Sequence, residues 1–252
     1  MNERKHWNNI AGQYNEEIFD VFASDKKKIL RKYFNKHEDR KGLAIDFGCG
    51  NGKAFRFLSP RFREVIGADI SEKLLKSAAA HGYKNVKLLH RDLALADADL
   101  PKADFLFSCN VIMLPDAEAS LRMFRNVAQA LKNGASAVIV VPSTESMMYT
   151  NWMLTELYRK EGTQLQDIHQ DEFSYFKGKR SEIASGVFYI DGVATRHYSA
   201  PQLKVVLKTA GLELTALERV TYDWTTELSE PPKDLKGPYP WDWLVECRLR
   251  KG

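Results

Sequence analysis

The stretch LAIDFGCGNG, from Leu43 to Gly52, decides the fold of this chain. Its first five residues, LAIDF, are apolar except for Asp46 and predict a short buried strand, which ends in a cluster of glycines in the order G-x-G-x-G. Glycines at such a turn let the backbone approach a ligand closely, and the helix that follows offers free N–H groups. Because KAFRFLS (53–59) has the pattern of that helix, the stretch predicts strand, glycine loop and helix in succession.

Strands and helices continue to alternate after this unit. Short apolar runs predict further strands at 63–70, 85–92, 103–114, 136–143, 212–224 and 241–251. Apolar residues at helical spacing predict helices at 71–82, 116–134 and 200–211. Strands that are apolar along their length and alternate with helices form a parallel sheet covered on both faces. The pattern therefore predicts an α/β fold with a doubly wound, mostly parallel sheet.

Two stretches interrupt this alternation. Residues 1–40 have a helical, charged pattern with interspersed aromatic residues, and residues 144–199 stand between the fifth and sixth strands. The second stretch contains a predicted helix at 145–160. Further on, Asp191-Gly192 separates two strand-like runs, which is the usual signal of a hairpin. We expect both stretches to be additions packed over the working edge of the sheet.

One domain is favoured over two, because no linker, repeat or low-complexity tract divides the chain. At about 100–200 residues per domain, length alone permits either arrangement. We expect a single domain over 1–252, with its core at about 40–143 and 198–251 and a cap or lid at about 1–39 and 144–197.

Composition and charge exclude several classes of protein. With 44% hydrophobic and 28% charged residues, the 252-residue chain has the composition of a globular domain. Its 37 basic and 33 acidic residues leave a net charge of +4, which is too weak and dispersed to indicate nucleic acid. Cys49, Cys109 and Cys247 have no metal-binding spacing and suit a reducing compartment. Since no apolar segment suggests a secretory signal or a membrane span, we expect a cytoplasmic protein.

Three acidic residues end successive predicted strands: Asp46, Asp69 and Asp92. Open parallel sheets bind ligands beyond the carboxyl ends of their strands, so these carboxylates would line one edge of the sheet. A carboxylate at Asp69 can accept hydrogen bonds from both hydroxyls of a ribose, and one at Asp92 can accept from the exocyclic amine of a purine. Each alone could be an ordinary strand-end aspartate, but the three together favour a ligand site at this edge.

The combined motifs resemble the class I S-adenosylmethionine (SAM) dependent methyltransferases, of the small-molecule type. The resemblance covers roughly residues 40–142 and 198–251. It is carried by AIDFGCGNG (44–52), GADIS (67–71), HRDLALADADLP (90–101), ADFLFSCNVIMLPD (103–116), RNVAQALKNGA (125–135), VIVVPS (138–143) and YSAPQLKVVLKTAGLE (198–213). It implies a seven-stranded, doubly wound α/β sheet whose last strand is antiparallel. It also implies an enzyme that transfers a methyl group from SAM to an O, N or C atom of a small molecule, leaving S-adenosylhomocysteine (SAH).

The resemblance also implies roles for residues of the first two strands and their loops. Gly48 and Gly50, with Asp46 behind them, would contact the methionine end of the cofactor. Asp69 would hold the ribose diol, and Ile70 would lie against the adenine.

Further roles follow for the third and fourth strands. Asp92 would receive the adenine amino group, with Leu93 as the other wall of the adenine site. Asn110, just after the fourth strand, would contribute backbone near the sulfonium. In IAGQY (10–14), Tyr14 matches an aromatic residue that closes over the cofactor in many relatives, and packing in an amphipathic helix is its alternative role. No metal site is expected.

The acceptor and any catalytic base are less defined by the sequence. A sulfonium methyl is already electrophilic, so in-line displacement mainly needs alignment and exclusion of water, with a base only if the acceptor must lose a proton. His197 and Tyr198, where the insertion rejoins the core, are the candidates for that base, and packing is the alternative. Relatives often carry a histidine near Pro115, where this chain has Leu114, so no base is expected there. The expected partner is a small molecule bound by a monomer or homodimer.

Other functions compete with this interpretation. An NAD(P)-dependent oxidoreductase would share the glycine loop and the ribose acid, but the third glycine of G-x-G-x-x-G is replaced by Lys53. The Tyr-x-x-x-Lys spacing of short-chain reductases occurs only at 83–87 and 175–179, neither in a convincing helix. An RNA (tRNA) methyltransferase uses the same core, and a binding module that retains SAM without activity is a third alternative.

Overall fold

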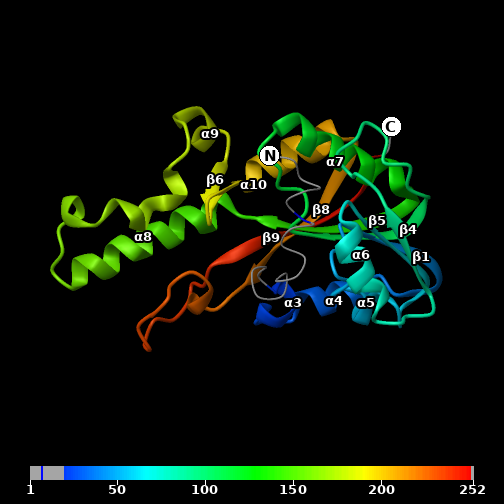
Figure 1. Cartoon of the computed structure of the whole chain (residues 1–252), viewed down its shortest axis with the longest axis horizontal. Coiled ribbons are helices and arrows are strands. Elements are labelled where there is room, and N and C mark those ends of the chain that lie inside the picture. Colours follow the sequence, from blue (N-terminus) through cyan, green and yellow to red (C-terminus); the bar gives the residue numbers. More distant parts are fainter. Residues whose placement is uncertain (1–6, 8–19, 251–252) are drawn as a thin grey trace.

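The structure is a computed structural model that describes residue 7 and residues 20–250, and it is built on a seven-stranded sheet (Figure 1). The strand order is β3-β2-β1-β4-β5-β9-β8. The strands are β1 Asp39–Phe47, β2 Phe62–Asp69, β3 Val86–His90, β4 Ala103–Cys109, β5 Leu131–Pro142, β8 Leu212–Thr221 and β9 Trp241–Leu249. Strands β1 to β5 pair in parallel, and β9 is antiparallel to both β5 and β8. This confirms the predicted sheet and its antiparallel last strand.

Helices cover both faces of the sheet and bury two apolar cores. One core packs α7 and α10 against the sheet, and the other packs α3 to α6 against the opposite face. Their bounds are α3 Val21–Ser24, α4 Ile29–Lys36, α5 Phe55–Leu58, α6 Glu72–Ala79, α7 Ala117–Ala130 and α10 Ala200–Thr209. Since β1 pairs with β2 on one side and β4 on the other, the strand order reverses there, which is where open α/β sheets bind their ligands.

Several element bounds differ from those predicted, each for a local reason. The helix predicted at 53–59 shortens to α5, because tight turns occupy the positions just after Gly52. The helix predicted to run to Gly134 ends at Ala130, since Leu131 is extended and pairs with Ala103 of β4. The strand predicted to reach Leu114 ends at Cys109, because the next residue adopts a positive φ.

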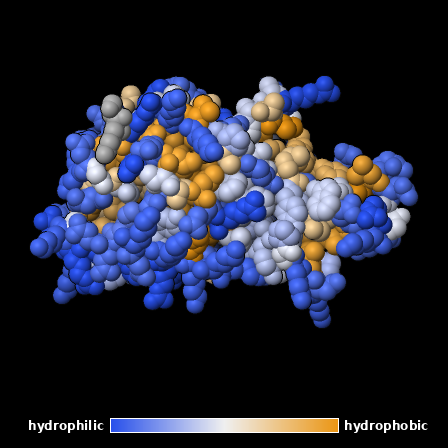
Figure 2. Space-filling view, turned by 180° about the vertical axis from the view of Figure 1, so that it is seen from behind, coloured by the Kyte–Doolittle hydropathy of each residue, from blue (hydrophilic) through white to orange (hydrophobic). Residues whose placement is uncertain are grey.

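The insertion leaves the carboxyl end of β5 and projects from the sheet as an arm (Figure 1). It comprises α8 Thr144–Lys160, η1 Leu165–Asp167, η2 Gln170–Phe176, α9 Arg180–Ala184 and the hairpin β6 Val187–Ile190 with β7 Val193–Arg196. The turn at Asp191-Gly192 confirms the predicted hairpin. Seen from behind, the arm carries apolar side chains among charged ones (Figure 2). Its helix α8 includes two exposed apolar side chains, Met148 and Trp152.

The hairpin packs back on the core, as the first turn of α8 does. The Arg196 backbone N–H donates to the Met113 carbonyl oxygen at 2.9 Å. Its guanidinium donates to the carbonyl oxygens of Leu114, Pro115 and Ser185. These bonds fix the insertion to the loop that follows β4, so the arm is anchored beside the carboxyl edge of the sheet.

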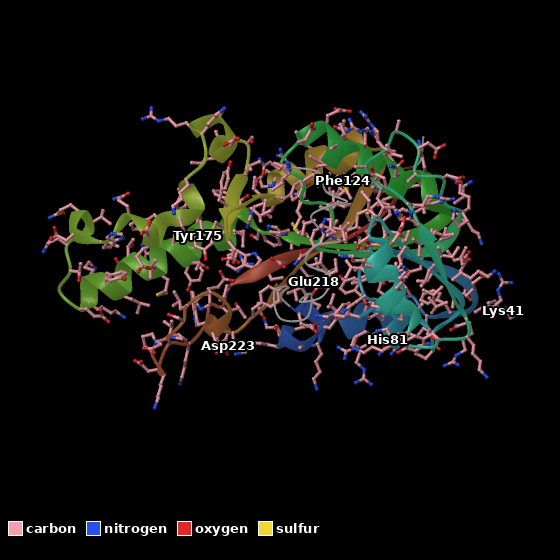
Figure 3. All side chains as sticks on the ribbon, viewed as in Figure 1. Lys41, His81, Phe124, Tyr175, Glu218 and Asp223 are labelled. Carbon is pink, nitrogen blue, oxygen red and sulfur yellow. The ribbon has the colours of Figure 1, made fainter. Side chains whose placement is uncertain are left out.

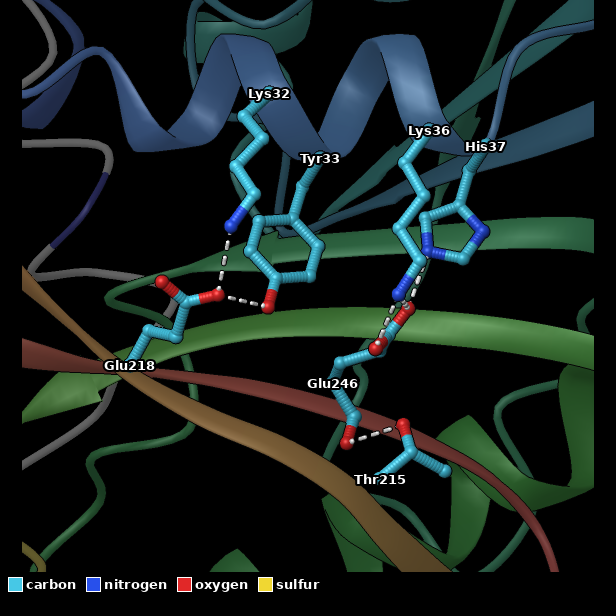
Figure 4. A network of polar contacts seen from close by, with 7 residues as sticks. All are labelled: Lys32, Tyr33, Lys36, His37, Thr215, Glu218 and Glu246. Carbon is cyan, nitrogen blue, oxygen red and sulfur yellow. Dashed lines mark hydrogen bonds and ion pairs between the residues drawn. The ribbon is translucent and has the colours of Figure 1, made fainter.

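A polar network fastens α4 to the two C-terminal strands (Figure 4). Glu246 on β9, with 5% of its side chain exposed, accepts from Lys36 Nζ at 2.7 and 2.8 Å and lies 2.6 Å from His37 Nε2. On β8, Glu218 accepts from Tyr33 Oη at 2.7 Å and Lys32 Nζ at 3.1 Å. Burial alone would raise the pKa of Glu246, but the bonds from Lys36 and His37 outweigh it and lower that pKa.

Replacing Glu246 with alanine should lower the free energy of unfolding by about 3 kcal/mol, because His37 and Lys36 lose their buried anionic partner. Since the pKa is lowered in the folded state, this contribution is present above the unfolded value of about 4.3 and is lost as the pH falls through the folded value. Urea denaturation between pH 7 and pH 3 should therefore show the variant converging on the wild type in acid.

Glu213→Ala is the matched control, because Glu213 forms an exposed ion pair with Arg248 across the same two strands. It should cost less than about 1 kcal/mol at any pH. An equal loss in both variants would show that the Glu246 network does not anchor α4.

Candidate functional site

The glycine loop after β1 turns across the carboxyl edge of the sheet. Gly48, Gly50 and Gly52 have φ values of +80°, +52° and +85°, a region that favours glycine. The N–H groups of Gly48 and Cys49 both donate to the Ala68 carbonyl oxygen on β2, at 2.8 and 3.0 Å. The loop is therefore held against the end of β2 by its own backbone.

Asp69 ends β2 and fixes the glycine loop directly. Its Oδ2 accepts from the Gly50 N–H at 2.8 Å, and its Oδ1 accepts from the Ser71 N–H at 2.8 Å. The residue is 8% exposed, and burial raises its pKa against the opposing effect of these backbone bonds. Because a carboxylate offers about four acceptor positions, both oxygens can accept further bonds from a vicinal diol.

Asp46 lies behind the loop with an unsatisfied carboxyl group. It is 3% exposed, and among the described residues its Oδ2 has no hydrogen-bond partner. Burial, and then the nearby Asp69 carboxylate, raise the pKa of Asp46 to about 8. A buried carboxyl oxygen without a partner is costly, and a ligand with a cationic or hydrogen-bond donor group would satisfy it.

The residues expected at an adenine site lie beyond β2 and β3. Ile70 is half-buried, and its carbonyl oxygen lies 2.9 Å from His90 Nε2. Asp92 is half-buried and its Oδ1 accepts from the Ala94 N–H at 2.9 Å, so its other oxygen can accept from a ligand. Leu93 is buried and belongs to the core beneath α7. The structure thus places Ile70 and Asp92 at the edge, with Leu93 beneath it.

Asn110 directly follows β4, and its side chain reaches past β5 to the start of β9. It has a φ of +52°, and its N–H donates to the Val140 carbonyl oxygen at 2.9 Å. Its Nδ2 donates to Asp242 Oδ2 at 3.1 Å, and the same oxygen accepts from Tyr222 Oη at 2.7 Å. Tyr222 and Asp242 were not predicted as site residues. The available signal was a charged residue between two tryptophans at the start of a core strand, which places a carboxylate at the carboxyl edge.

The two candidates for a base lie in packed surroundings. His197 is 5% exposed, its ring packs edge-on against Phe188, and burial lowers its pKa to about 4. Tyr198 is buried against Phe124 of α7, and burial raises its pKa to about 12. Neither has the exposure or the pKa of a base that works near neutral pH. Tyr14, the third residue expected to close the site, lies outside the described residues.

Metal ligands and membrane helices are absent from the part of the chain that the structure describes. In residue 7 and residues 20–250, no three His, Cys, Asp or Glu side chains are grouped so as to hold a metal ion. Within the same residues, no helix combines the length and apolar character that crossing a bilayer requires.

Comparisons with known proteins agree with this geometry. Residues 44–134 match the family model described as "Methyltransferase domain". The probable S-adenosylmethionine-dependent methyltransferase CRG1 of Saccharomyces cerevisiae is 26% identical over 136 residues, which are 52% of this chain and 42% of that protein. The chain thus matches less than half the length of this curated relative.

Solved structures share the fold over nearly the whole chain. A structure described as a DhpI-SAM-HEP complex has a TM-score of 0.60 at 15% identity, covering 97% of this chain and 94% of that one. A SAM-dependent methyltransferase from Anabaena variabilis has a TM-score of 0.63 at 14% identity, covering 99% and 96%. At such identities the likeness establishes the fold and leaves the substrate open.

Proposed function

We propose that this class I methyltransferase, identified by its domain match at 44–134 and its sheet topology, transfers a methyl group from SAM to a small-molecule acceptor. The observation that carries the proposal is the arrangement of Asp46, Asp69 and the glycine loop at the switch in strand order. We infer that the chain is a single domain. We also infer that it acts in the cytoplasm, which its free cysteines at 49, 109 and 247 favour.

The residues of the edge fit the parts of SAM. The buried, unsatisfied Asp46 suits the ammonium of the methionine end, approached through the glycine loop. Asp69, with both oxygens at the end of β2, suits the ribose diol, and Asp92 suits the adenine amino group. Because the loop is fixed before any ligand arrives, little ordering entropy would be lost on binding.

The protein's main task in this reaction is alignment. When bound, SAM supplies a methyl group that is already activated by the sulfonium. The half-buried residues after β4 and at the start of β9 would exclude water and hold the acceptor in line, which is worth about 7–11 kcal/mol in well-oriented reactions. His197 and Tyr198 are buried and packed, so neither is proposed as a base.

The charge beyond Asn110, on the side where the acceptor would bind, favours a small acceptor over RNA. Asp242 and Glu227 are half-buried there, and a polyanion would have to approach these carboxylates. A polynucleotide would instead require a continuous basic surface at this edge.

A screen with methyl-labelled SAM tests the choice of acceptor. The purified chain is incubated with a small-metabolite extract and, separately, with total RNA, and the label is followed by mass spectrometry. We expect label in the small-molecule fraction, with a rate that depends little on salt. Label in RNA, with a steep loss of activity between 50 and 200 mM salt as phosphate contacts require, would identify the RNA enzyme instead.

A further inference from the structure

Both oxygens of the buried Asp69 carboxylate accept from backbone N–H groups that are themselves parts of longer hydrogen-bond chains. Oδ1 accepts from the Ser71 N–H and Oδ2 from the Gly50 N–H, each at 2.8 Å. Because the carboxylate is buried, these bonds take the place of water that would otherwise solvate its charge. Each chain leads outward from the carboxylate through peptide groups and ends at the ring of a histidine.

The shorter chain contains one peptide group and begins at His90. His90 is the last residue of β3 and stands opposite Asp69 in the parallel register of β2 and β3. Its Nε2 lies 2.9 Å from the Ile70 carbonyl oxygen, which can only accept, so Nε2 carries the proton. The same peptide group donates through the Ser71 N–H to Asp69 Oδ1. On the other side of the ring, Nδ1 lies 3.5 Å from Glu72 Oε1, so both ring nitrogens face the connection between β2 and α6.

The longer chain contains two peptide groups and begins at His81, which follows the end of α6 (Figure 3). His81 Nε2 donates to the Asn51 carbonyl oxygen at 2.9 Å. The N–H of the same peptide group, which belongs to Gly52, donates to the Cys49 carbonyl oxygen at 2.8 Å. The peptide group of that carbonyl ends in the Gly50 N–H, which donates to Oδ2 of the carboxylate. This chain therefore runs through the glycine loop.

Hydrogen bonds that are joined through a peptide group polarise one another. A donor at the carbonyl oxygen makes the N–H of the same peptide group a stronger donor, and the low dielectric around a buried group strengthens the effect. Every N–H dipole in the two chains points toward Asp69, so each link stabilises the negative charge there. The chains also fix the two oxygens, because turning any of these peptide groups would break the bonds at both of its ends.

We propose that His90 and His81 are positioning residues for the cofactor, which hold and polarise the Asp69 carboxylate that binds the ribose diol. This proposal rests on the proposed function and adds the two groups that prepare its ribose site. Both histidines are exposed, so the two chains connect the surface of the protein to the buried carboxylate. Each ring acts through peptide groups and does not itself need to touch the ligand.

Leucine and glutamine at these two positions separate hydrogen bonding from packing. Leucine removes the donor, whereas the amide nitrogen of glutamine can replace the ring Nε2 as donor. By isothermal titration with SAH we expect His90→Leu to bind about fivefold more weakly than the wild type, as the loss of one hydrogen bond implies. His81→Leu should bind about threefold more weakly, because its chain contains one more peptide group. His90→Gln and His81→Gln should each stay within about twofold of the wild type.

A double variant that combines His90→Leu with Asp69→Asn shows whether the histidine acts through the carboxylate. Asparagine lacks the charge that the chain from His90 stabilises, so His90→Leu should weaken SAH binding less than about twofold in this background. A residue that only supported the fold would cost about fivefold in both backgrounds. His169→Leu is the matched control, because His169 is an exposed histidine of the arm, 3.4 Å from Asp171, and this variant should bind SAH as the wild type does.

Wild-type affinity for SAH in either leucine variant would overturn the proposal. An equal loss in the leucine and glutamine variants would also overturn it, since the rings would then act by packing. The same holds for a loss in His90→Leu that is undiminished beside Asp69→Asn. Each of these results would leave the proposed methyl transfer from SAM in place. Failure of the wild-type chain to bind SAH would instead refute the proposed function.

Discussion

Replacing Asp69 with asparagine is expected to weaken SAM binding about 100-fold, or roughly 3 kcal/mol, while the chain stays folded. Asparagine has nearly the same shape, so one oxygen can still accept from the Gly50 or the Ser71 N–H. It loses the charge and the second acceptor that a bidentate contact with a ribose diol requires. Isothermal titration with SAM and a circular dichroism melting curve measure the two effects separately.

Asp99→Asn provides the comparison for this variant. Asp99 is an exposed carboxylate near the same edge, paired with Arg91 at 3.1 Å, and its loss should leave SAM affinity unchanged. If Asp69→Asn bound SAM as tightly as Asp99→Asn does, Asp69 would not hold the ribose. A collapse of the melting transition in Asp69→Asn would assign the residue to the loop's stability instead.

Replacing Gly48 with alanine should destabilise the chain by about 3 kcal/mol, as a left-handed φ and overpacking together require. Gly48 has a φ of +80°, and an added Cβ would lie 2.3 and 2.4 Å from the two Cγ atoms of Val111. The loop would have to move away from β4, so SAM affinity should fall beyond detection at 1 mM. Thermal unfolding should show a decrease in Tm of about 6–12 °C.

Gly82→Ala separates the two causes of that loss. Gly82 also has a positive φ, +70°, but a Cβ there would meet nothing within 4 Å. It should cost about 1 kcal/mol and leave SAM binding intact. Val111→Ala in the Gly48→Ala background removes the clashing methyl groups and should recover part of the stability. A Gly48→Ala chain as stable as Gly82→Ala would show that the loop does not need the close approach to Val111.

Much of the fold follows from local sequence signals. The apolar runs predicted the strands because parallel strands are buried on both faces, and helical spacing predicted the helices between them, such as α6 within 71–82. The register and the order of strands are not local properties. The resemblance implied the seven-stranded sheet with its antiparallel last strand, whereas the strand-end positions of Asp46 and Asp69 predicted that they share one edge, as they do in the structure.

The acceptor side could not be predicted in the same way. Asn110 and Asp242 are distant in the sequence, and only the pairing of β9 between β5 and β8 brings Asp242 to the carboxyl edge, where it accepts from Asn110. His197 was a candidate base because it stands where the insertion rejoins the core, with packing as the alternative. In the structure Arg196 fastens the hairpin to the loop after β4, and His197 is buried with it.

Direct titration of the wild-type chain with SAH, and separately with NADH, tests the central claim most directly. Both ligands carry an adenosine with a free ribose diol, which an edge built from a glycine loop and Asp69 could accept, so the comparison asks which of the two cofactors binds there. We predict one SAH bound per chain, with an affinity that Asp69→Asn weakens about 100-fold, and no detectable binding of NADH. Binding of NADH in the absence of any binding of SAH would contradict the account.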